Sequence, residues 1–403
     1  MTLTLRHAAL AVRAEGSDAR LMRYRLLDWL ACPEDRHFPL LISDVEEDRP
    51  AISKAARAVP CESYCGRWQT SAGVVAANDC AFCDHVQVTR AKIECPGCGA
   101  RFAVADGIPA MLPWSVTQAV AGAPTVPADR GLRDKVQEMR ARDRQAARYD
   151  ARRVLFHTLA ERQALLGRLH VRPGDRVLDG GAGTGHMTLQ SLAAGGEVVA
   201  VDLSRRSLDV LRARIAGEHS ERAHLIQGDL CRLPLRDGIF DKAVQAQVLE
   251  HLPTPDDRLL ALSETMRVLK PGGAFVLSVY NLSLWKKRAA ARGERDSAER
   301  EGYHGGEIYY RNFEAAELCS LLETCFRVKR AHGVIVKLPK DLQYRLGRCG
   351  LWLERGLQMT PLSRLLGHLL VAECRAAPDG RGDPGVGYPL VGRQRANVSD
   401  NRG

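Results

Sequence analysis

The sequence predicts an α/β chain with two domains, a Rossmann-like sheet and, ahead of it, a small cysteine-rich domain of the α+β class. Two observations lead to this prediction. A strand, a glycine-rich turn and a helix follow one another directly at 176–194, which is how the first unit of such a sheet begins. Seven of the twelve cysteines lie between Cys32 and Cys98, in a segment that precedes the sheet.

The glycine-rich turn is the most informative segment. The first strand ends at Asp179, and four glycines follow it: Gly180, Gly181, Gly183 and Gly185. Glycine permits a positive φ and a close approach to a ligand, because it has no Cβ. The turn opens a helix expected over 186–194, whose free N–H groups face the turn. A second strand, 197–201, ends on Asp202, where a carboxylate is placed to hold the hydroxyls of a ribose.

A glycine turn with a ribose carboxylate is compatible with NAD, FAD or S-adenosylmethionine. The dinucleotide pattern G-x-G-x-x-G is absent, because Gly181, Gly183 and Gly185 are spaced G-x-G-x-G. Asp179 at the end of the first strand would repel a pyrophosphate and favour a cationic amino acid group. The pattern therefore favours S-adenosylmethionine.

Five ordered segments strengthen this interpretation. They are VLDGGAGTGHMT at 177–188, VDLS at 201–204, GDLCRLPLRDGIFD at 228–241, VLEHL at 248–252 and RVLKPGGAFVLSV at 267–279. Together they resemble the class I S-adenosylmethionine-dependent methyltransferases, most of all the ubiquinone-type and other small-molecule branch, over about residues 145–335. The resemblance implies a seven-stranded sheet whose final strand, 368–374, lies antiparallel between the fifth and sixth strands.

The resemblance also implies how the cofactor is held. Asp229 would accept from the adenine amino group, with Leu230 packed on the ring. Leu203 follows the ribose acid and belongs to the same site. Tyr149, in a Tyr-Asp pair ahead of the core, would contact the cofactor from a lid helix. Gln245 lies near the end of the fourth strand, which brings 245–251 close to the transferred methyl group.

Methyl transfer is an in-line displacement at a sulfonium, so the protein aligns the acceptor and, for a hydroxyl or activated carbon, removes a proton. A histidine with a pKa near neutral suits this step. The candidates are His251, after the fourth strand, and His304, in the loop EGYHGGEIYY. The alternatives are structural: His251 packs under the sheet edge, and His304 is merely solvated.

The chain has no D/N-P-P-Y tetrapeptide and no cysteine just after the fourth strand, which argues against two groups of nucleic-acid methyltransferases.

The N-terminal cysteines indicate a metal. Six of them form close pairs, and one stands alone before the pairs: Cys61 with Cys65, Cys80 with Cys83, Cys95 with Cys98, and Cys32. A two-residue gap lets two thiolates reach one tetrahedral zinc, and in a cytoplasmic chain such pairs favour a metal over disulfides. Buried free cysteines are the alternative. All-thiolate ligation leaves no position for water, so the zinc would be structural.

The frame around these cysteines is LLDWLACPEDRHFPL at 26–40 and IECPGCGARFAVADGIPAMLP at 93–113. It resembles the small zinc-ribbon protein that activates tRNA, rRNA and protein methyltransferases. That family often has CPxC where this chain has Asp35 in place of the second cysteine. Asp35 or His37 would complete a site with Cys32, Cys95 and Cys98, and the other four cysteines would form a second site. The rival pairing joins Cys80, Cys83, Cys95 and Cys98 in one ribbon. The sequence leaves both open, with about one or two zinc ions per chain.

These features divide the chain into an N-terminal tail 1–24, a zinc-ribbon domain with a cysteine-rich insertion 25–113, a linker 114–131, a methyltransferase domain 132–376 and a disordered tail 377–403. The methyltransferase domain comprises a lid helix 132–169, a core 170–282, and a cap with the last strands 283–376. Further helices are expected over 205–216, 254–269 and 313–325, and strands over 224–227, 241–248, 274–279 and 326–337. The insertions 283–310 and 338–366 would cap an apolar pocket lined by Trp285, Tyr309, Tyr310 and Trp352. Alternatively, the basic amphipathic segment 338–366 would lie on a membrane surface.

The net charge is +10, and residues 286–403 carry 21 Lys and Arg against 14 Asp and Glu. This excess would suit an acidic substrate, RNA phosphates or an anionic membrane surface, or it is simply a solvated face.

No apolar run approaches the ~20 residues that span a bilayer, and the first 27 residues lack the features of a signal peptide. A cytoplasmic protein is expected.

The sequence thus predicts an S-adenosylmethionine-dependent methyltransferase that transfers a methyl group to an oxygen or carbon of a small or lipid-like molecule. Two alternatives stay open. One is an rRNA or tRNA base methyltransferase whose zinc ribbon binds RNA. The other is a non-catalytic scaffold that only binds the cofactor, against which the intact Asp179, Asp202 and Asp229 argue. The oligomeric state does not follow from the sequence.

Overall fold

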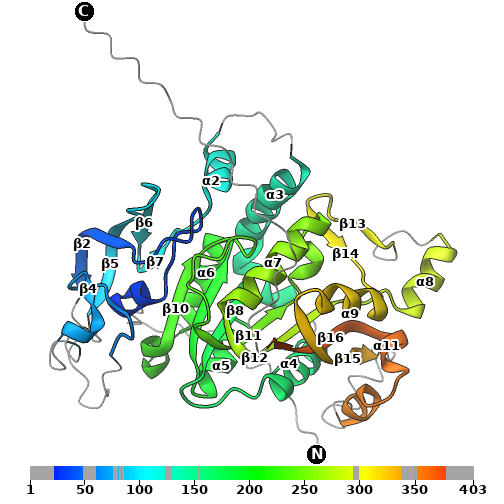
Figure 1. Cartoon of the computed structure of the whole chain (residues 1–403). Coiled ribbons are helices and arrows are strands. Elements are labelled where there is room, and N and C mark those ends of the chain that lie inside the picture. Colours follow the sequence, from blue (N-terminus) through cyan, green and yellow to red (C-terminus); the bar gives the residue numbers. More distant parts are fainter. Residues whose placement is uncertain are drawn as a thin grey trace, which may run out of the picture.

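The computed structural model describes residues 22–48, 60–75, 80, 83, 86–122, 129–152, 155–215, 217–293, 299–336, 350 and 352–377. A large sheet with helices on both faces forms the centre of the molecule, and a smaller domain lies at one side (Figure 1). Of the two expected tails, only 22–24 and 377 fall within the described residues. Residues 22–24 belong to the smaller domain, which therefore begins before the expected boundary at 25.

The central sheet has seven strands in the order β10-β9-β8-β11-β12-β16-β15. Their bounds are β8 Arg176–Gly180, β9 Glu197–Asp202, β10 Ala223–Gln227, β11 Phe240–Ala246, β12 Leu269–Tyr280, β15 Phe326–Val336 and β16 Gly367–Ala376. In this order each strand from β10 through β9, β8 and β11 to β12 is parallel to its neighbour. Strand β16 is antiparallel to both β12 and β15. The predicted seven-stranded Rossmann-like sheet, with its last strand inserted between the fifth and sixth, is confirmed.

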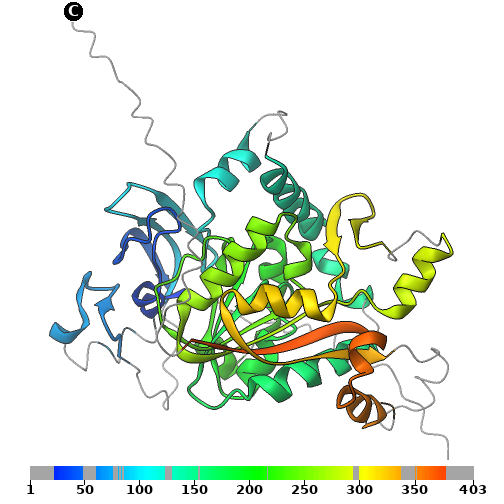
Figure 2. The same cartoon turned by 45° about the vertical axis from the view of Figure 1, so that its right-hand side comes forward.

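The inner strands are apolar along their length because both faces of the sheet are covered. Helices α4 (Leu155–Leu169), α5 (Thr188–Ala193) and α6 (Arg205–Arg214) bury their apolar side chains on one face. Helices α7 (Pro255–Val268) and α9 (Ala315–Glu323) pack on the other, as Figure 2 shows. Thr254 caps α7 by accepting from the Asp257 N–H.

The smaller domain is built on a five-stranded antiparallel sheet. Its strands are β1 Met22–Arg23, β2 Leu41–Asp48, β5 Gln87–Glu94, β6 Arg101–Ala105 and β7 Ile108–Pro109. A short hairpin, β3 Tyr64–Cys65 with β4 Thr70–Ser71, and two 3-10 turns, η1 Tyr24–Asp28 and η2 Ala72–Val74, complete the described part. Asp28 fixes the start of the hairpin by accepting from the backbone N–H groups of 62–64.

This domain packs on the large sheet and covers the part of one face that α7 and α9 leave open. Leu27, Trp29 and Leu30 share one hydrophobic core with Val199 and Ile226 of β9 and β10. The Met111 N–H donates to the Gln227 carbonyl at 2.8 Å, so the end of the small domain pairs with the edge strand β10. Pairing with an edge strand hides hydrogen-bonding groups that would otherwise stay open.

The Trp29 ring anchors this domain interface. It is 1% exposed, meets the His224 ring edge-on at 5.0 Å, and lies 5.0 Å below the Arg176 guanidinium. Arg25 stacks over the same ring and pairs with Glu197 at the start of β9. Because apolar and charged contacts coincide here, the two domains form one continuous body.

Two expectations for 114–169 are corrected. The expected linker 114–131 contains helix α2 (Trp114–Ala121), because this stretch has no glycine or proline. The single lid helix expected over 132–169 is instead α3 (Arg130–Gln145), the 3-10 turns η3 (Ala146–Arg148) and η4 (Asp150–Arg152), and α4. Asp150 accepts from Thr184 at 2.9 Å and pairs with Arg214 at 2.5 Å, and these tertiary contacts stabilise the break.

The insertion after β12 forms helix α8 (Leu284–Ala291) and the hairpin β13 (Glu301–His304) with β14 (Ile308–Arg311). Before β16 come the helical residues 352–358 and helix α11 (Ser363–Leu366). Much of the basic segment expected over 338–366, namely 338–349 and 351, lies outside the described residues. No helix in the described ranges is long and apolar enough to cross a membrane.

Candidate functional site

A pocket opens at the carboxyl ends of β8, β9, β10 and β11, and helix α3 forms its roof. The strand ends supply Asp179, Asp202 and Asp229, and the turn after β8 supplies Gly181 and Gly183. Leu203, Leu230 and Tyr149, all predicted to contact a cofactor, also line this pocket. The structure therefore brings most of the predicted cofactor residues together in one place.

The glycine turn forms the floor of the pocket. Gly181 and Gly183 have φ values of 72° and 52°, and a Cβ on Gly183 would project into open space. Gly180 and Gly185, predicted as cofactor contacts, are not among the pocket residues. A Cβ at Gly185 would come within 2.1 Å of Leu211, so this glycine is needed for packing against α6. Gly180 is the last residue of β8 and packs against Leu230 and Gln245.

Asp179 lies 1% exposed at the end of β8 and accepts from the Thr188 hydroxyl at 2.5 Å. Burial raises its pKa to about 7, against the opposing effect of the Thr188 hydrogen bond. An acid at the pocket wall that is partly protonated near neutral pH is stabilised in its charged form when a cation binds beside it.

Asp202 ends β9 and holds two backbone amides. Its carboxylate oxygens accept from the Gly183 N–H at 2.7 Å and from the Ser204 N–H at 2.8 Å. Each oxygen has a second lone pair, which leaves acceptor capacity for two hydroxyl groups. Burial raises the pKa of Asp202. The acid thus fixes the glycine turn and offers the acceptors that a ribose diol requires.

Asp229, after β10, is paired with a lysine of the roof helix. The Lys135 ammonium lies 2.6 Å from the Asp229 carboxylate and 3.7 Å from that of Asp257. Asp143, two turns further along α3, accepts from the Ser204 hydroxyl at 2.6 Å. Helix α3 therefore lies across the pocket, held by Lys135 at the end of β10 and by Asp143 at the end of β9.

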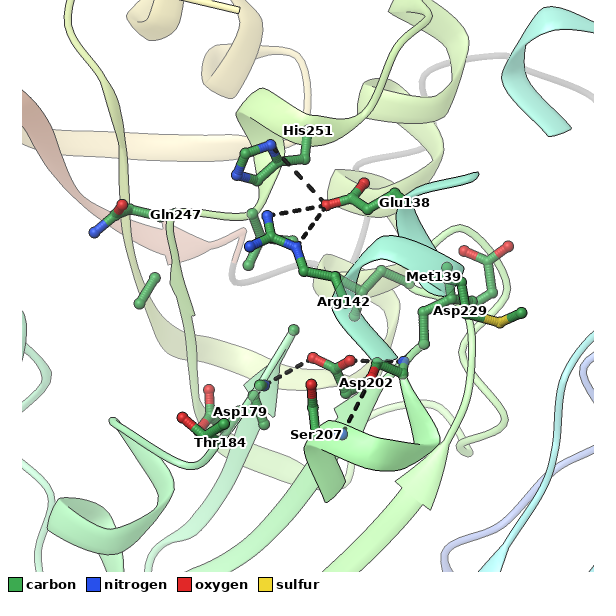
Figure 3. A pocket seen from close by; sticks show the side chains of 18 of the residues that line it. Glu138, Met139, Arg142, Asp179, Thr184, Asp202, Ser207, Asp229, Gln247 and His251 are labelled. Carbon is green, nitrogen blue, oxygen red and sulfur yellow. Dashed lines mark hydrogen bonds and ion pairs between the residues drawn. The ribbon is translucent and has the colours of Figure 1, made fainter. Parts of the chain in front are cut away.

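The roof helix also carries an ion pair that faces into the pocket. Arg142 donates to Glu138 Oε1 from two nitrogens at 3.1 and 3.2 Å, and its guanidinium lies 5.8 Å from the centre of the Tyr149 ring. Figure 3 shows Glu138 and Arg142 reaching from α3 toward His251. Burial raises the pKa of Glu138 to about 6, although Arg142 opposes the shift.

His251 lines the pocket beside this ion pair, at 6% exposure. Its Nδ1 lies 2.7 Å from the Tyr309 carbonyl oxygen, which only accepts, so the proton is assigned to Nδ1 and the lone pair to Nε2. Burial and the nearby Arg142 lower its pKa well below the usual value. His251 is therefore neutral near pH 7, and its Nε2 lone pair can accept a proton. Its lowered pKa makes it a weaker base than the near-neutral histidine expected from the sequence.

His304, the other predicted base, occupies a different place. It ends β13, stacks on the Tyr310 ring at 4.2 Å and meets Tyr280 edge-on at 5.8 Å. His304 is not among the pocket residues. The Tyr280 ring contacts both histidines, because its centre also lies 5.8 Å from that of the His251 ring.

Gln245, predicted as a cofactor contact, points away from the pocket. It is 1% exposed and donates to the Thr265 hydroxyl of α7 at 2.9 Å. The pocket residue is Gln247, which follows the end of β11 in a left-handed conformation with φ 57°. Glu161 of α4 accepts from its amide at 2.7 Å and from the Ser278 hydroxyl at 2.6 Å, which fixes the orientation of Gln247.

The aromatic residues expected to line an apolar substrate pocket do not line the pocket described above. Tyr309 and Tyr310 are buried, while Trp285 and Trp352 are 41% and 76% exposed. None of the four lies among the pocket residues.

The side chains that cover the site are Lys135, Glu138 and Arg142, which the sequence analysis did not select. Their i, i+3 and i+7 spacing on one helix face was the available signal.

One group of metal-binding side chains is assembled in the described part of the small domain. It consists of Cys32, Asp35, Cys95 and Cys98, whose ligand atoms all lie within 4.8 Å of one another. Cys32 Sγ is 3.6 Å from Cys98 Sγ, and Cys95 Sγ is 3.4 Å from an Asp35 oxygen. The edges of a tetrahedron with Zn–S bonds of about 2.3 Å measure roughly 3.7 Å, so the four side chains fit zinc.

These distances favour the first of the two pairings for this site. Cys95 and Cys98 lie with Cys32 and Asp35, and Cys80 and Cys83 are not part of this group. His37 is not part of the group. Cys61, Cys65, Cys80 and Cys83 do not meet the same distance criterion among the described residues. Burial and then the negative charges of Asp28 and the other three cysteines raise the pKa of Cys61.

Two family models match the chain: the methyltransferase domain over residues 178–277 and the Trm112p-like protein over residues 23–107. A demethylmenaquinone methyltransferase of Staphylococcus haemolyticus is 36% identical over 118 residues, which cover 28% of this chain and 47% of that protein. A malonyl-[acyl-carrier protein] O-methyltransferase of Serratia marcescens is 35% identical over 135 residues, covering 34% and 49%. The chain spans about half the length of these curated relatives. A chain from the complex of the Haloferax volcanii Trm112 methyltransferase activator with a methyltransferase has a TM-score of 0.43 at 20% identity, covering 59% of this chain and 97% of that one.

Proposed function

Residues 178–277 are a methyltransferase domain and residues 23–107 a Trm112p-like domain, and from this premise we propose that the chain transfers the methyl group of S-adenosylmethionine to an oxygen or carbon of a small or lipid-like molecule. The observation that carries the proposal is the arrangement of Asp179, Asp202 and Asp229 at the ends of three neighbouring strands around one pocket. Each acid suits a different part of the cofactor.

The residues present fit this cofactor. Asp202 would bind the ribose hydroxyls, because its oxygens keep lone pairs beyond the two backbone amides. Asp179 would bind the amino group of the methionyl part, which favours the ionised carboxylate. Asp229 would accept from the adenine amino group once Lys135 has moved, with Leu230 against the ring. The bound cofactor supplies an activated methyl group on a cationic leaving group.

His251 is the proposed general base. Its Nδ1–H is fixed on the Tyr309 carbonyl, so Nε2 is the nitrogen that takes a proton from the acceptor. Glu138 lies 4.0 Å from Nδ1 and stabilises the imidazolium that forms. Arg142 keeps Glu138 oriented and lowers the pKa of the resting histidine. His304, the other predicted base, lies outside this pocket, so we propose it as a contact to the acceptor in place of the base.

The class of acceptor rests on the relatives. Their names describe methyl transfer to demethylmenaquinone and to malonyl-[acyl-carrier protein], and neither name describes a nucleic acid. An acceptor with an acidic hydroxyl or an activated carbon needs a base of the kind that His251 offers. We therefore extend small-molecule methylation, and not base methylation of RNA, to this chain.

The small domain would act in cis. It covers one face of the sheet and pairs with the edge strand β10, which ends one residue before the Gly228-Asp229 corner of the pocket. The proposed zinc at Cys32, Asp35, Cys95 and Cys98 would hold this domain together, and a second zinc at the remaining four cysteines is a further proposal.

The test is a methyl-transfer assay with radiolabelled S-adenosylmethionine and three acceptor sets: hydroquinones and other phenols, small or carrier-bound carboxylic acids, and structured RNA. Label in an extracted small molecule, lost in His251→Gln, supports the proposal. Label in RNA alone would refute it and favour an RNA methyltransferase. Cofactor binding without transfer to any set would instead favour a non-catalytic role.

A further inference from the structure

The exposed apolar side chains of the molecule gather near its C-terminal end. Twelve large hydrophobic side chains are exposed among the described residues, and five of them lie within 352–365: Trp352, Leu353, Met359, Leu362 and Leu365. Trp352 is 76% exposed and Met359 is 66% exposed. Such a local concentration on a soluble chain marks an interaction surface.

The usual amphipathic helix packs its apolar face on the protein, and these segments have the opposite orientation. Trp352 begins the helical residues 352–358, and Met359 follows directly after them. The two residues are seven positions apart, which corresponds to about two helical turns and places them on the same side. The opposite face holds Glu354, which is 1% exposed and accepts from the Ile335 N–H of β15 at 2.6 Å. The polar residue thus anchors the helix on the protein, and the apolar residues face outward.

The next turn repeats the pattern. Ser363, at the start of α11, is 1% exposed, and its hydroxyl accepts from the Gly333 N–H at 3.2 Å. Leu362 and Leu365, on either side of it, are 60% and 48% exposed. Two successive segments therefore bury a polar side chain and present apolar ones.

Arginines surround this apolar surface. Arg330 reaches Met359, with its guanidinium 4.0 Å from the sulfur, and Arg364 donates to the Ala331 carbonyl at 2.8 Å. Arg168 donates to the Ala164 carbonyl at 2.7 Å. Burial and the positive charges of Arg330 and Arg355 lower the pKa of Arg168 to about 10, although the negative charge of Glu373 opposes the shift. An anionic partner would relieve their repulsion.

Helix α8 extends the surface toward the pocket. It contacts α11 and carries Trp285, 41% exposed, with the Arg288 guanidinium 5.7 Å from its ring centre. Asn281, which precedes α8, donates to the Arg364 and Gly367 carbonyls, each at 2.8 Å. Asn281 follows Tyr280, whose ring meets His251. Tyr280 and Asn281 therefore connect the pocket residue His251 to the base of this surface.

We propose that this surface, defined by Trp352, Leu353, Met359, Leu362 and Leu365 with Arg330, Arg355 and Arg364, docks on an anionic lipid bilayer. Trp352 and Met359 enter the interface, and the arginines bind lipid phosphates, as expected for an interfacial helix with aromatic and basic residues. Charge complementarity favours anionic over zwitterionic lipid. The inference goes beyond the proposed methyl transfer, because docking requires neither cofactor nor acceptor.

The test is flotation of the full chain with vesicles of phosphatidylglycerol and phosphatidylcholine, and with vesicles of phosphatidylcholine alone. We expect binding to the anionic vesicles that weakens with added salt. The double variant Trp352→Ala/Met359→Ala should bind at least about tenfold more weakly, since two large apolar side chains no longer enter the interface. Arg355→Gln should lower binding about fivefold on anionic vesicles only.

Trp114→Ala is the matched control, because Trp114 is 67% exposed on α2 and lies outside this surface. It should bind like the wild type. Equal weakening by Trp114→Ala, or no binding to anionic vesicles, would overturn the proposal. Self-association that is lost in the double variant, seen by sedimentation velocity without lipid, would assign the surface to a second copy instead. Because all substituted side chains are exposed, unchanged S-adenosylhomocysteine affinity should show that every variant is folded.

Discussion

The pKa of Asp179 makes cofactor binding depend on pH. In the free protein burial raises this pKa to about 7, so the acid is largely protonated at pH 5.5 and largely ionised at pH 7.5. A cationic amino group binds the ionised form, so binding lowers the pKa and releases a proton. Affinity should therefore rise with pH up to the pKa of about 7 and level off above it.

The magnitude follows from the ionised fraction. With a pKa near 7, that fraction falls on the order of 20-fold between pH 7.5 and pH 5.5, and the affinity should fall by the same factor. Isothermal titration calorimetry with S-adenosylhomocysteine, in buffers of different ionisation enthalpy, measures both the affinity and the proton release. Near pH 6 the release should approach about one proton per binding event.

Asp179→Asn is the control for this reasoning, because it keeps the shape of the side chain but cannot ionise. Its affinity should be low and nearly independent of pH. Glu138, with a pKa of about 6, is the other pocket acid that titrates in this range, and a small remaining slope would be assigned to it. If Asp179→Asn retained the full slope, Asp179 would not be the group that binds the amino group.

Three further predictions concern the interface, the base and the metal. Trp29→Ala should lower the free energy of unfolding by about 3–5 kcal/mol in urea denaturation, whereas Trp68→Ala, whose side chain is 55% exposed, should leave it nearly unchanged. His251→Gln should reduce kcat about 10²–10⁴-fold with little change in S-adenosylhomocysteine affinity, and a comparable loss of affinity would argue for a binding role. Cys95→Ser should remove about one zinc per chain in metal analysis, and unchanged zinc content would refute the assigned ligand group.

The sheet and its three acids were predictable because their signals are local. A strand that ends in an acid and is followed by glycines predicts a tight turn and places the acid beside that turn. Asp179, Asp202 and Gly183 accordingly line the same pocket. The topology, including the inserted strand β16, was implied by the resemblance to the class I methyltransferases and is confirmed.

The roof of the pocket was not predictable in the same way. The helical periodicity of 130–145 shows that a helix forms, but it does not tell which face docks on the sheet. The face with Lys135, Glu138 and Arg142 is polar, so its burial depends on partners such as Asp229 that are distant in sequence. Tertiary contacts of Asp150 also broke a helix that local propensity would have continued.

The choice of Gln245 in place of Gln247, two positions further on, has a simple cause. Successive side chains of a strand point to opposite faces, and beyond the strand end this alternation no longer applies. Gln245 is still within β11 and faces α7, while Gln247 lies past its end and faces the pocket. For the cysteines, spacing left two pairings open, and the distances among Cys32, Asp35, Cys95 and Cys98 favour one of them.

The central claim is that the pocket at the strand ends holds S-adenosylmethionine. The most direct test is calorimetric titration of the wild type, Asp202→Ala and Asp256→Ala with this cofactor at pH 7.5, where Asp256 is an exposed acid at the start of α7. The account predicts stoichiometric binding by the wild type and Asp256→Ala, and a loss of on the order of 100-fold in Asp202→Ala, since two charge-assisted hydrogen bonds disappear. Equal affinity in all three proteins, or no binding by the folded wild type, would contradict it.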